Sequence, residues 1–393
     1  MSQDVFVAGV GMIPFMKPGT NPHYDVMASQ AVKEALEDAG VSYDTVQQAY
    51  VGYMYGNSTY GQKVLYKFGM TGIPVFNVHN NCATGSSALF LARQAVASGS
   101  CDVALALGFE EMSPGALGGL WTDRPGSLEA FNEVMEQQVG QIEIPPALRL
   151  FGAAGQAHMK KYGTKMETFA AIRAKASRHA ANNPRAVFRN VVSVDDVMNE
   201  KVMWPGVMTR SMACPPTCGA AAAVVVSEAY ARKHGLRTDV KIAAQTMTTD
   251  RPDALEGDLL RLVGFGMAQS GAKAAYEQAG IGPDDIDVVE LHDCFAHNEL
   301  LTYEALGLCP EGGAEKFVQD GDNTYGGKYV TNPSGGLLSK GHPLGATGLA
   351  QCFELTHQLR GTAGKTQVEG AKVALQHNLG LGGACVVTVY QKN

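Results

Sequence analysis

Four short segments of the chain combine reactive side chains with glycine. A cysteine thiol and histidine rings, brought together, could perform nucleophilic catalysis, because imidazole can accept the proton of an attacking thiol. Each segment follows a predicted strand or begins a predicted helix, and ligand sites of α/β sheets form at such places. We expect them to converge on one site; they are Asn80-Asn81-Cys82-Ala83-Thr84-Gly85-Ser86, His292-Asp293-Cys294-Phe295, Gly341-His342-Pro343-Leu344-Gly345 and His377-Asn378-Leu379-Gly380-Leu381-Gly382-Gly383.

Cys82 is the candidate nucleophile. A predicted helix begins just after it, and the N–H groups and positive dipole end of a helix favour a thiolate and lower its pKa. The small neighbours Ala83 and Gly85 leave room for a substrate. An inert, buried cysteine is the alternative that position alone leaves open. Four further cysteines lack reactive neighbours and are interpreted as packing residues: Cys101, Cys309, Cys352 and Cys385.

His342 is the candidate base for this thiol. It lies at the start of a predicted helix, where it could take the thiol proton and hold the thiolate as an ion pair. Alternatively, its ring N–H could cap a turn. His292 and Cys294 share a loop after an apolar strand at 286–291, and Asp293 between them could hold that loop by accepting backbone N–H bonds.

Metal-ligand and nucleotide motifs are weak in this sequence. His297 lies five residues after His292, which differs from the His-x-x-x-His spacing of zinc helices. Cys214 and Cys218 have no second ligand pair nearby. Gly9-Val10-Gly11 follows a predicted strand, but the third glycine of a dinucleotide fingerprint is missing. We therefore expect no metal and no resident cofactor.

The elements that position these groups occur twice in the chain. Residues 39–52 (AGVSYDTVQQAYVG) and 279–292 (AGIGPDDIDVVELH) both indicate a helix end, an acidic turn and an apolar strand. The Ala-Thr-Gly sequences at 83–85 and 346–348 both begin an apolar helix that leads to a buried strand. Chance similarity is the alternative, but two repeats in the same order favour duplication. Alternating helices and apolar strands predict two α/β halves with parallel-type sheets covered on both faces.

A segment of different character separates the two copies. Residues 118–206 are richer in charge, methionine and aromatic side chains, and they predict a mostly helical insertion into the first half. Insertions at strand ends commonly build ligand pockets. The predicted organisation is an N-terminal half made of residues 1–117 and 207–236, the inserted domain at 118–206, and a C-terminal half at 237–393.

Composition excludes several classes of protein. The net charge of −7 and the pI near 5.8 argue against binding to nucleic acid. The apolar runs are all shorter than the ~18–20 residues that a membrane helix needs. The first residues show no signal peptide, and eight scattered cysteines do not form a disulfide framework. These features favour a cytoplasmic enzyme.

The motifs together resemble the thiolase superfamily, most closely the sterol-carrier-protein-type (sterol carrier protein x-like) 3-oxoacyl-CoA thiolases. The resemblance covers essentially the whole chain and rests on NNCATGSSALF at 80–90, HDCF at 292–295, ALGLCPEG at 305–312, NPSGGLLSKGHPLGATGLAQC at 332–352 and ALQHNLGLGGA at 374–384. It implies a five-layer αβαβα sandwich of two similar halves with an inserted loop domain. It also implies a homodimer or homotetramer with acyl-CoA and CoA as substrates.

The resemblance implies a role for each site residue. Cys82 matches the acyl-accepting nucleophile and His342 the histidine that activates it and helps bind the thioester oxygen. His292 stands where most thiolases have an asparagine of the first oxyanion hole, and the N–H groups of Cys82 and Gly380 match the second hole. The usual acid/base cysteine of Cys-x-Gly is replaced here by Asn378. Cys294 is the replacement expected in this subfamily.

The implied reaction is CoA-dependent cleavage of 3-oxoacyl-CoA, or the reverse condensation, through an acyl-cysteine. Two alternatives use the same fold. A retro-aldolase or condensing enzyme of steroid side-chain metabolism is disfavoured because both Cys82 and Cys294 are present. A non-catalytic acyl-CoA or lipid-binding protein would have no need to keep either cysteine. The sequence does not indicate the acyl chain.

Overall fold

The computed structural model describes residues 3–114 and 123–393, and its strands repeat one order twice. The order across the sheet is β10-β9-β11-β12-β8-β1-β7-β4-β2-β3. Each half contributes five strands, and the two sets correspond strand by strand when they are followed from the two edges of the sheet inward. The halves meet where Phe6 of β1 pairs with Lys241 of β8. The first-half strands are β1 (Val5–Met12), β2 (Gln48–Gly52), β3 (Val75–Val78), β4 (Val103–Glu110) and β7 (Gly219–Ser227). The second-half strands are β8 (Val240–Thr248), β9 (Val288–Glu290), β10 (Val330–Thr331), β11 (Val373–Gly380) and β12 (Ala384–Lys392).

The duplication predicted from sequence is confirmed by the matching elements. The first repeat forms the end of α1 (Tyr24–Ala39) and β2, and its partner forms the end of α10 (Phe265–Ala279) and β9. The two Ala-Thr-Gly sequences lead into α3 (Thr84–Ala97) and α14 (Thr347–Arg360), which continue to β4 and β11. One expectation is wrong. The sheets are mixed, because β7 and β12 each run antiparallel to both neighbours.

Helices complete five layers. On the outer faces, α1 packs against β1 and α10 packs against β8. Between the halves, α3 packs on β4, α14 packs on β11, and the two helices contact each other. Their interface belongs to a continuous apolar core that includes Leu89, Ala92, Leu349 and Leu355. This arrangement is the predicted αβαβα sandwich. The remaining short helices of the two halves are α2 (Tyr60–Leu65), α8 (Glu228–His234), α9 (Leu259–Leu262), α11 (Ala296–Ala305), α12 (Ala314–Gln319) and α13 (Gly336–Ser339).

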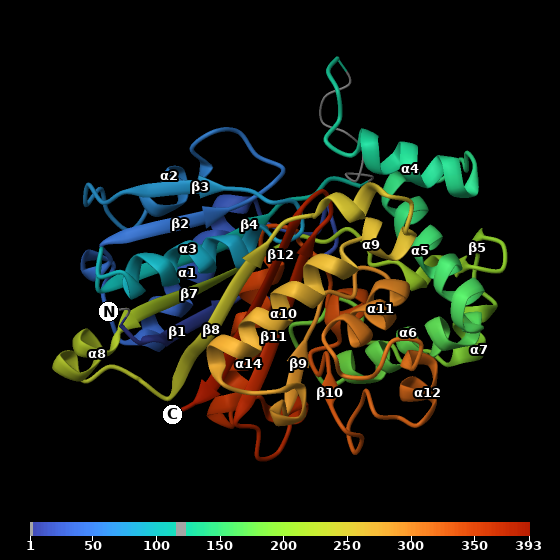
Figure 1. Cartoon of the computed structure of the whole chain (residues 1–393). Coiled ribbons are helices and arrows are strands. Elements are labelled where there is room, and N and C mark those ends of the chain that lie inside the picture. The colour runs from blue at the N-terminus through green and yellow to red at the C-terminus, as the bar shows by residue number, and fades with distance from the viewer. Residues whose placement is uncertain (1–2, 115–122) are drawn as a thin grey trace.

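The segment inserted into the first half is mostly helical, as the sequence indicates. Its elements are α4 (Glu129–Val139), α5 (Pro146–Tyr162), α6 (Met166–Ala180), α7 (Val194–Met198) and the hairpin of β5 (Val202–Trp204) and β6 (Met208–Thr209). Although it interrupts the first half in sequence, α5 and α6 pack on α11 of the second half (Figure 1). The boundaries given for the three domains stay a prediction, and the one between 117 and 118 lies outside the described residues.

A buried ion pair fastens the insertion to the second half. Lys175 on α6 pairs with Glu299 on α11 and also donates to Thr331 Oγ1 at 2.6 Å. We expect Lys175→Met to lower the free energy of unfolding by about 3–5 kcal/mol, because it leaves a buried carboxylate without its partner. Urea denaturation at fixed protein concentration measures this. Lys316→Ala, which breaks an exposed pair with Asp320, is the control and should leave stability unchanged.

Candidate active site

Cys82 lies in a tight turn between β3 and α3. Asn81 precedes it with a φ of 50°, a left-handed conformation that asparagine tolerates better than most residues. The hydroxyl of Thr84 donates to the Asn81 carbonyl at 2.6 Å and accepts the Asn80 N–H at 2.8 Å. These bonds hold the turn, and they leave Cys82 half-buried at the wall of a cavity.

The N-terminal turns of α3 and α14 cross at very close range, which joins the two halves at the site. A Cβ on Gly85 would lie 2.6 Å from the Gly345 carbonyl oxygen, and one on Gly348 would lie 2.2 Å from Ser86 N. Both positions therefore require glycine for space. The two glycines occupy equivalent positions in the duplicated motif, so the repeat has a packing reason that the sequence did not reveal.

His342 is held on both sides by threonine hydroxyls. Its backbone N–H donates to Thr217 Oγ1 at 2.6 Å, and its Nδ1 lies 2.7 Å from Thr347 Oγ1. The Thr347 hydroxyl donates to the Pro343 carbonyl at 3.0 Å, so it accepts the Nδ1–H of His342. Nε2 then carries a free lone pair, and it is buried without a hydrogen-bond partner. The imidazole can therefore act as a base through Nε2. The alternative role of capping a turn is filled by Nδ1–H, which donates to Thr347.

His292 and Cys294 follow β9 in a buried loop. Between them, Asp293 accepts the N–H of Leu337 at 2.7 Å and of Leu338 at 3.3 Å, so it anchors the loop to α13, as expected. His292 meets His342 edge to face, with ring centroids 5.1 Å apart.

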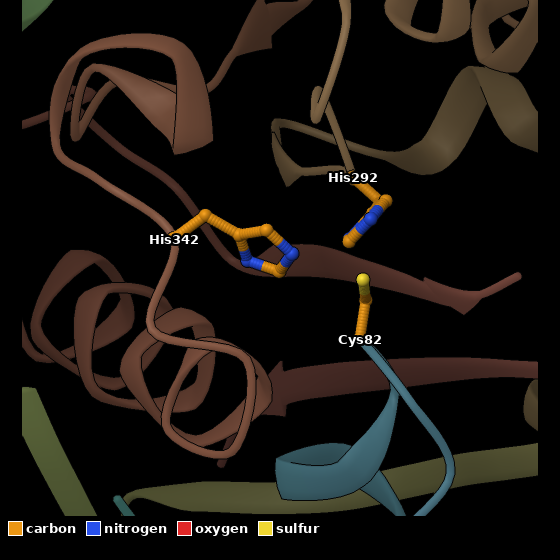
Figure 2. A group of neighbouring side chains, drawn as sticks. All are labelled: Cys82, His292 and His342. Atoms are coloured by element: carbon orange, nitrogen blue, oxygen red, sulfur yellow. The ribbon is translucent and has the colours of Figure 1, made fainter. Parts of the chain in front are cut away.

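Three of the predicted site residues meet at one point. Side-chain ligand atoms of Cys82, His292 and His342 all lie within 4.8 Å of one another (Figure 2). The three come from different elements: the turn before α3, the loop after β9 and the loop before α14. Gly380 ends β11 against the Cys82 turn, where a Cβ would lie 2.1 Å from the Asn80 carbonyl oxygen and 3.1 Å from Ala83 N.

A cavity of about 370 Å³ opens onto Cys82, Cys294 and His342. Most of its remaining wall is apolar and includes residues of the insertion and of the second half: Leu128, Ala147, Leu148, Phe151, Phe295, Leu344 and Leu381. The two cysteine side chains thus share one chamber. Phe151 stacks on Phe295 with ring centroids 4.8 Å apart, so the insertion packs directly against the residue that follows Cys294.

Cys214 also lines this cavity, a position that the sequence did not indicate for it. The segment 213–217 runs between two catalytic candidates. The N–H of Cys214 donates to the Cys294 carbonyl at 2.8 Å, and Thr217 accepts the His342 N–H. The sequence held no signal for this, because the contacts depend on where a loop after the insertion returns to the sheet.

Glu110 is a second residue that the sequence did not single out. It lies fully buried at the end of β4 and accepts the N–H groups of Tyr55 at 2.8 Å and Gly345 at 3.0 Å. Burial raises the pKa of this carboxyl to about 7. Glu110 therefore ties a cavity-lining loop of the first half to the His342 loop of the second half.

Burial dominates the titration of the site. It raises the pKa of the Cys82 thiol to about 12 and lowers the pKa of His342 to about 3. It also raises the pKa of Cys294 well above its usual value, with Cys214 and Cys82 adding to the effect. The expectation that the helix start lowers the pKa of Cys82 is therefore wrong. The resting pair is a neutral thiol and a neutral imidazole, and the proton must move as the thiol attacks.

This neutral pair predicts the ultraviolet spectrum of the protein. We expect wild type and Cys82→Ala to show the same thiolate absorbance below about pH 9, because a raised pKa keeps the thiol protonated there. Absorbance titration of both proteins across this range measures the difference. A thiolate step between wild type and variant near neutral pH would instead indicate a Cys82–His342 ion pair.

Sulfur and imidazole nitrogen are ligands that zinc accepts, so the cluster of Cys82, His292 and His342 is the candidate metal site among the described residues. The Nδ1 atom of His292 is already engaged by the side-chain amide of Asn378 at 3.0 Å. A metal would therefore have to use Nε2 of that ring.

Known protein families match both halves of the chain. Residues 5–203 match the thiolase N-terminal domain, and residues 259–392 match the thiolase C-terminal domain-like family. The chain belongs to the thiolase family. The fold and the resemblance found in the sequence are thus confirmed for this thiolase.

Curated relatives match this thiolase over nearly its full length. Sterol carrier protein 2 of Rattus norvegicus is 54% identical over 98% of this chain and 72% of its own length. Non-specific lipid-transfer protein-like 2 of Caenorhabditis elegans is 47% identical over 98% of this chain and 96% of its own. Benzoylsuccinyl-CoA thiolase subunit BbsB of Thauera aromatica is 36% identical over 97% and 96%.

Solved structures share the fold. An aldolase, Ltp2-ChsH2(DUF35), superposes with a TM-score of 0.84 at 22% identity, covering 99% of this thiolase and 98% of that chain. Human mitochondrial 3-ketoacyl-CoA thiolase in complex with CoA gives a TM-score of 0.75 at 19% identity, covering 100% and 98%. At these identities the likeness shows the fold alone. Among the described residues of this thiolase, no helix is long and apolar enough to cross a membrane.

Proposed function

We propose that the protein catalyses CoA-dependent thiolytic cleavage of 3-oxoacyl-CoA to acyl-CoA and acetyl-CoA, or the reverse Claisen condensation, through an acyl-cysteine intermediate. The observation that carries this proposal is the meeting of Cys82, His292 and His342 within 4.8 Å. Cys82 and His342 share their mostly apolar cavity with a second cysteine, Cys294. Membership of the thiolase family supports the same reaction.

The first step is attack of Cys82 on the 3-keto carbon. Nε2 of His342 takes the thiol proton as the sulfur–carbon bond forms, since neither group is charged at rest. The resulting alkoxide is stabilised by the backbone N–H groups of Cys82 and Gly380. Donors that are already in place lower the barrier because they need not reorganise as charge develops.

Carbon–carbon cleavage follows. The alkoxide collapses to a thioester on Cys82, and the electron pair of the broken bond enters the enolate of acetyl-CoA. His292 and His342 face the enolate oxygen, and His342 does so with the proton that it has gained. Cys294 protonates the enolate carbon, a role that suits a thiol whose raised pKa keeps it protonated at rest.

The second half-reaction regenerates the enzyme. The thiolate of Cys294 takes the proton of incoming CoA, and the CoA sulfur attacks the acyl-Cys82 carbonyl. The released Cys82 sulfur recovers its proton from His342. Every proton and electron pair is thus returned, so the cycle requires CoA as a substrate and no resident cofactor or metal.

The finer assignments rest on sequence and family resemblance. We propose that the protein binds acyl-CoA and CoA, assembles as a homodimer or homotetramer and works in the cytoplasm. Sedimentation of the purified chain tests the assembly.

Product analysis tests the proposed reaction. Purified protein is incubated with 3-oxoacyl-CoA esters of increasing chain length and, separately, with the matching 3-hydroxyacyl-CoA esters. Each incubation is run with and without CoA, and products are identified by mass spectrometry. Thiolysis yields acyl-CoA and acetyl-CoA only when CoA is added. A retro-aldolase would cleave a 3-hydroxyacyl-CoA without added CoA, and a binding protein would leave all substrates intact.

A further inference from the structure

A buried chain of hydrogen bonds leads from the core to His292. It begins at Tyr390 on β12, whose hydroxyl donates to Gln376 Oε1. The amide of Gln376 donates to Ser86 Oγ at 2.8 Å, and Ser86 donates to Asn378 Oδ1 at 2.8 Å. The amide of Asn378 then lies 3.0 Å from His292 Nδ1. The chain thus passes from β12 through β11 and α3 to the loop after β9.

Two backbone carbonyls determine which group donates and which accepts at each hydrogen bond of this network. Gln376 Nε2 lies 2.7 Å from the Gly348 carbonyl, and Asn378 Nδ2 lies 3.1 Å from the Cys82 carbonyl. A carbonyl oxygen can only accept, so both contacting atoms are NH₂ groups and neither amide can be flipped. His292 Nδ1 must therefore accept the Asn378 N–H.

The accepted hydrogen bond determines where the His292 proton lies. Neutral imidazole has one N–H, and when Nδ1 accepts, the proton is on Nε2. Burial, with His342 and His377 nearby, lowers the pKa of His292 well below its usual value, so the ring stays neutral. His292 is therefore a neutral donor through Nε2, whereas His342 offers a lone pair at the corresponding atom.

We propose that Asn378 is a positioning residue for the reaction, which fixes the tautomer and ring orientation of His292 so that Nε2–H faces the enolate oxygen. The inference deepens the proposed function and rests on it for its catalytic meaning. Asn378 contacts His292 at Nδ1, on the side of the ring opposite the proposed donor Nε2–H, and it also donates to the Cys82 carbonyl. One amide thus positions both the His292 loop and the Cys82 turn.

The same contact discriminates against a metal ion. Metal binding through Nε2 would move the ring proton to Nδ1, where it would oppose the fixed NH₂ group of Asn378. Two donors would then face each other in a buried site, which costs a hydrogen bond and leaves both groups unsatisfied. The arrangement thus favours an oxyanion over a cation beside His292.

Nitrogen NMR tests the tautomer without any substrate. In ¹⁵N-histidine-labelled wild type, with His292→Asn used to assign the signal, we expect Nε2 protonated and Nδ1 unprotonated. In Asn378→Asp, whose carboxylate accepts instead of donating, we expect Nδ1 to become protonated. An Nδ1–H signal in wild type, or an unprotonated Nδ1 in the variant, would overturn the proposal.

Kinetics test the positioning role. Asn378→Leu is nearly isosteric and removes the donor, so we expect kcat to fall by about 10–100-fold while KM changes little. Asn378→Ser, whose side chain is smaller than asparagine, should also lower kcat. It replaces the leucine variant in this experiment if that variant does not fold. Rates are divided by the number of alkylatable Cys82 sites, which removes the effect of unfolded protein. An unchanged kcat in a folded variant contradicts the proposal.

Thr246→Val is the matched control. It removes another buried hydrogen bond of the second half, from Thr246 Oγ1 to the Gly271 carbonyl, outside the chain that leads to His292. Its kcat should stay at the wild-type value. If wild type cleaves no 3-oxoacyl-CoA, the proposed function fails, whereas the NMR result still decides whether Asn378 fixes the His292 ring.

Discussion

Cys82→Ala should abolish the acyl-enzyme and lower kcat for thiolysis on the order of 10⁵-fold or more. Every proposed step passes through a thioester on this sulfur. The two other cysteines at the cavity, Cys214 and Cys294, do not belong to the cluster of Cys82 with the two histidines. Incubation with isotope-labelled acyl-CoA, followed by intact-protein mass spectrometry, measures the acyl-enzyme.

Cys309→Ser is the control for that experiment. Cys309 is half-buried outside the cavity, so its loss should leave both labelling and thiolysis at the wild-type level. An acyl group that still attaches to the Cys82→Ala protein at a different cysteine would show that Cys82 is not the acyl acceptor.

Cys294→Ala should lower kcat by about 10²–10⁴-fold, the range expected for loss of a general acid and base. The variant can still present the Cys82 thiol and both histidines, but the enolate carbon has no nearby acid and CoA has no base. Proton exchange of acetyl-CoA, which belongs to the condensation direction, measures the acid/base role of Cys294 separately from thiolysis. We expect solvent deuterium to enter the methyl group of acetyl-CoA in wild type and to enter far more slowly in the variant.

A second measurement separates a catalytic loss from a misfolded site. Iodoacetamide should modify Cys82 in Cys294→Ala at a rate close to that in wild type, because the turn before α3 does not depend on the Cys294 thiol. Deuterium exchange in the variant that equals exchange in wild type would remove Cys294 from the proposed mechanism.

The fold was largely predictable from the sequence because the chain repeats itself. Two α/β halves were predicted from the repeated segments at 39–52 and 279–292 and from the two Ala-Thr-Gly helix starts. In the structure the repeated segments form β2 and β9, and the helix starts begin α3 and α14. Strand direction was not predictable. An apolar run such as 219–227 has the same composition whether it pairs parallel or antiparallel, and β7 and β12 are antiparallel.

The reactive residue types and the family could be identified from the sequence alone. Cys82, His292, Cys294 and His342 were singled out because their neighbours carry local, recognisable motifs. The pKa values and the orientations of these side chains, in contrast, depend on the tertiary fold. Burial raises the pKa of Cys82, whereas the sequence predicted a lowered value. The loop that follows the insertion places Cys214 at the cavity. Two backbone carbonyls from other segments orient the side-chain amides of Gln376 and Asn378. Desolvation and hydrogen-bond direction depend on groups far apart in the chain, and residue spacing does not encode them.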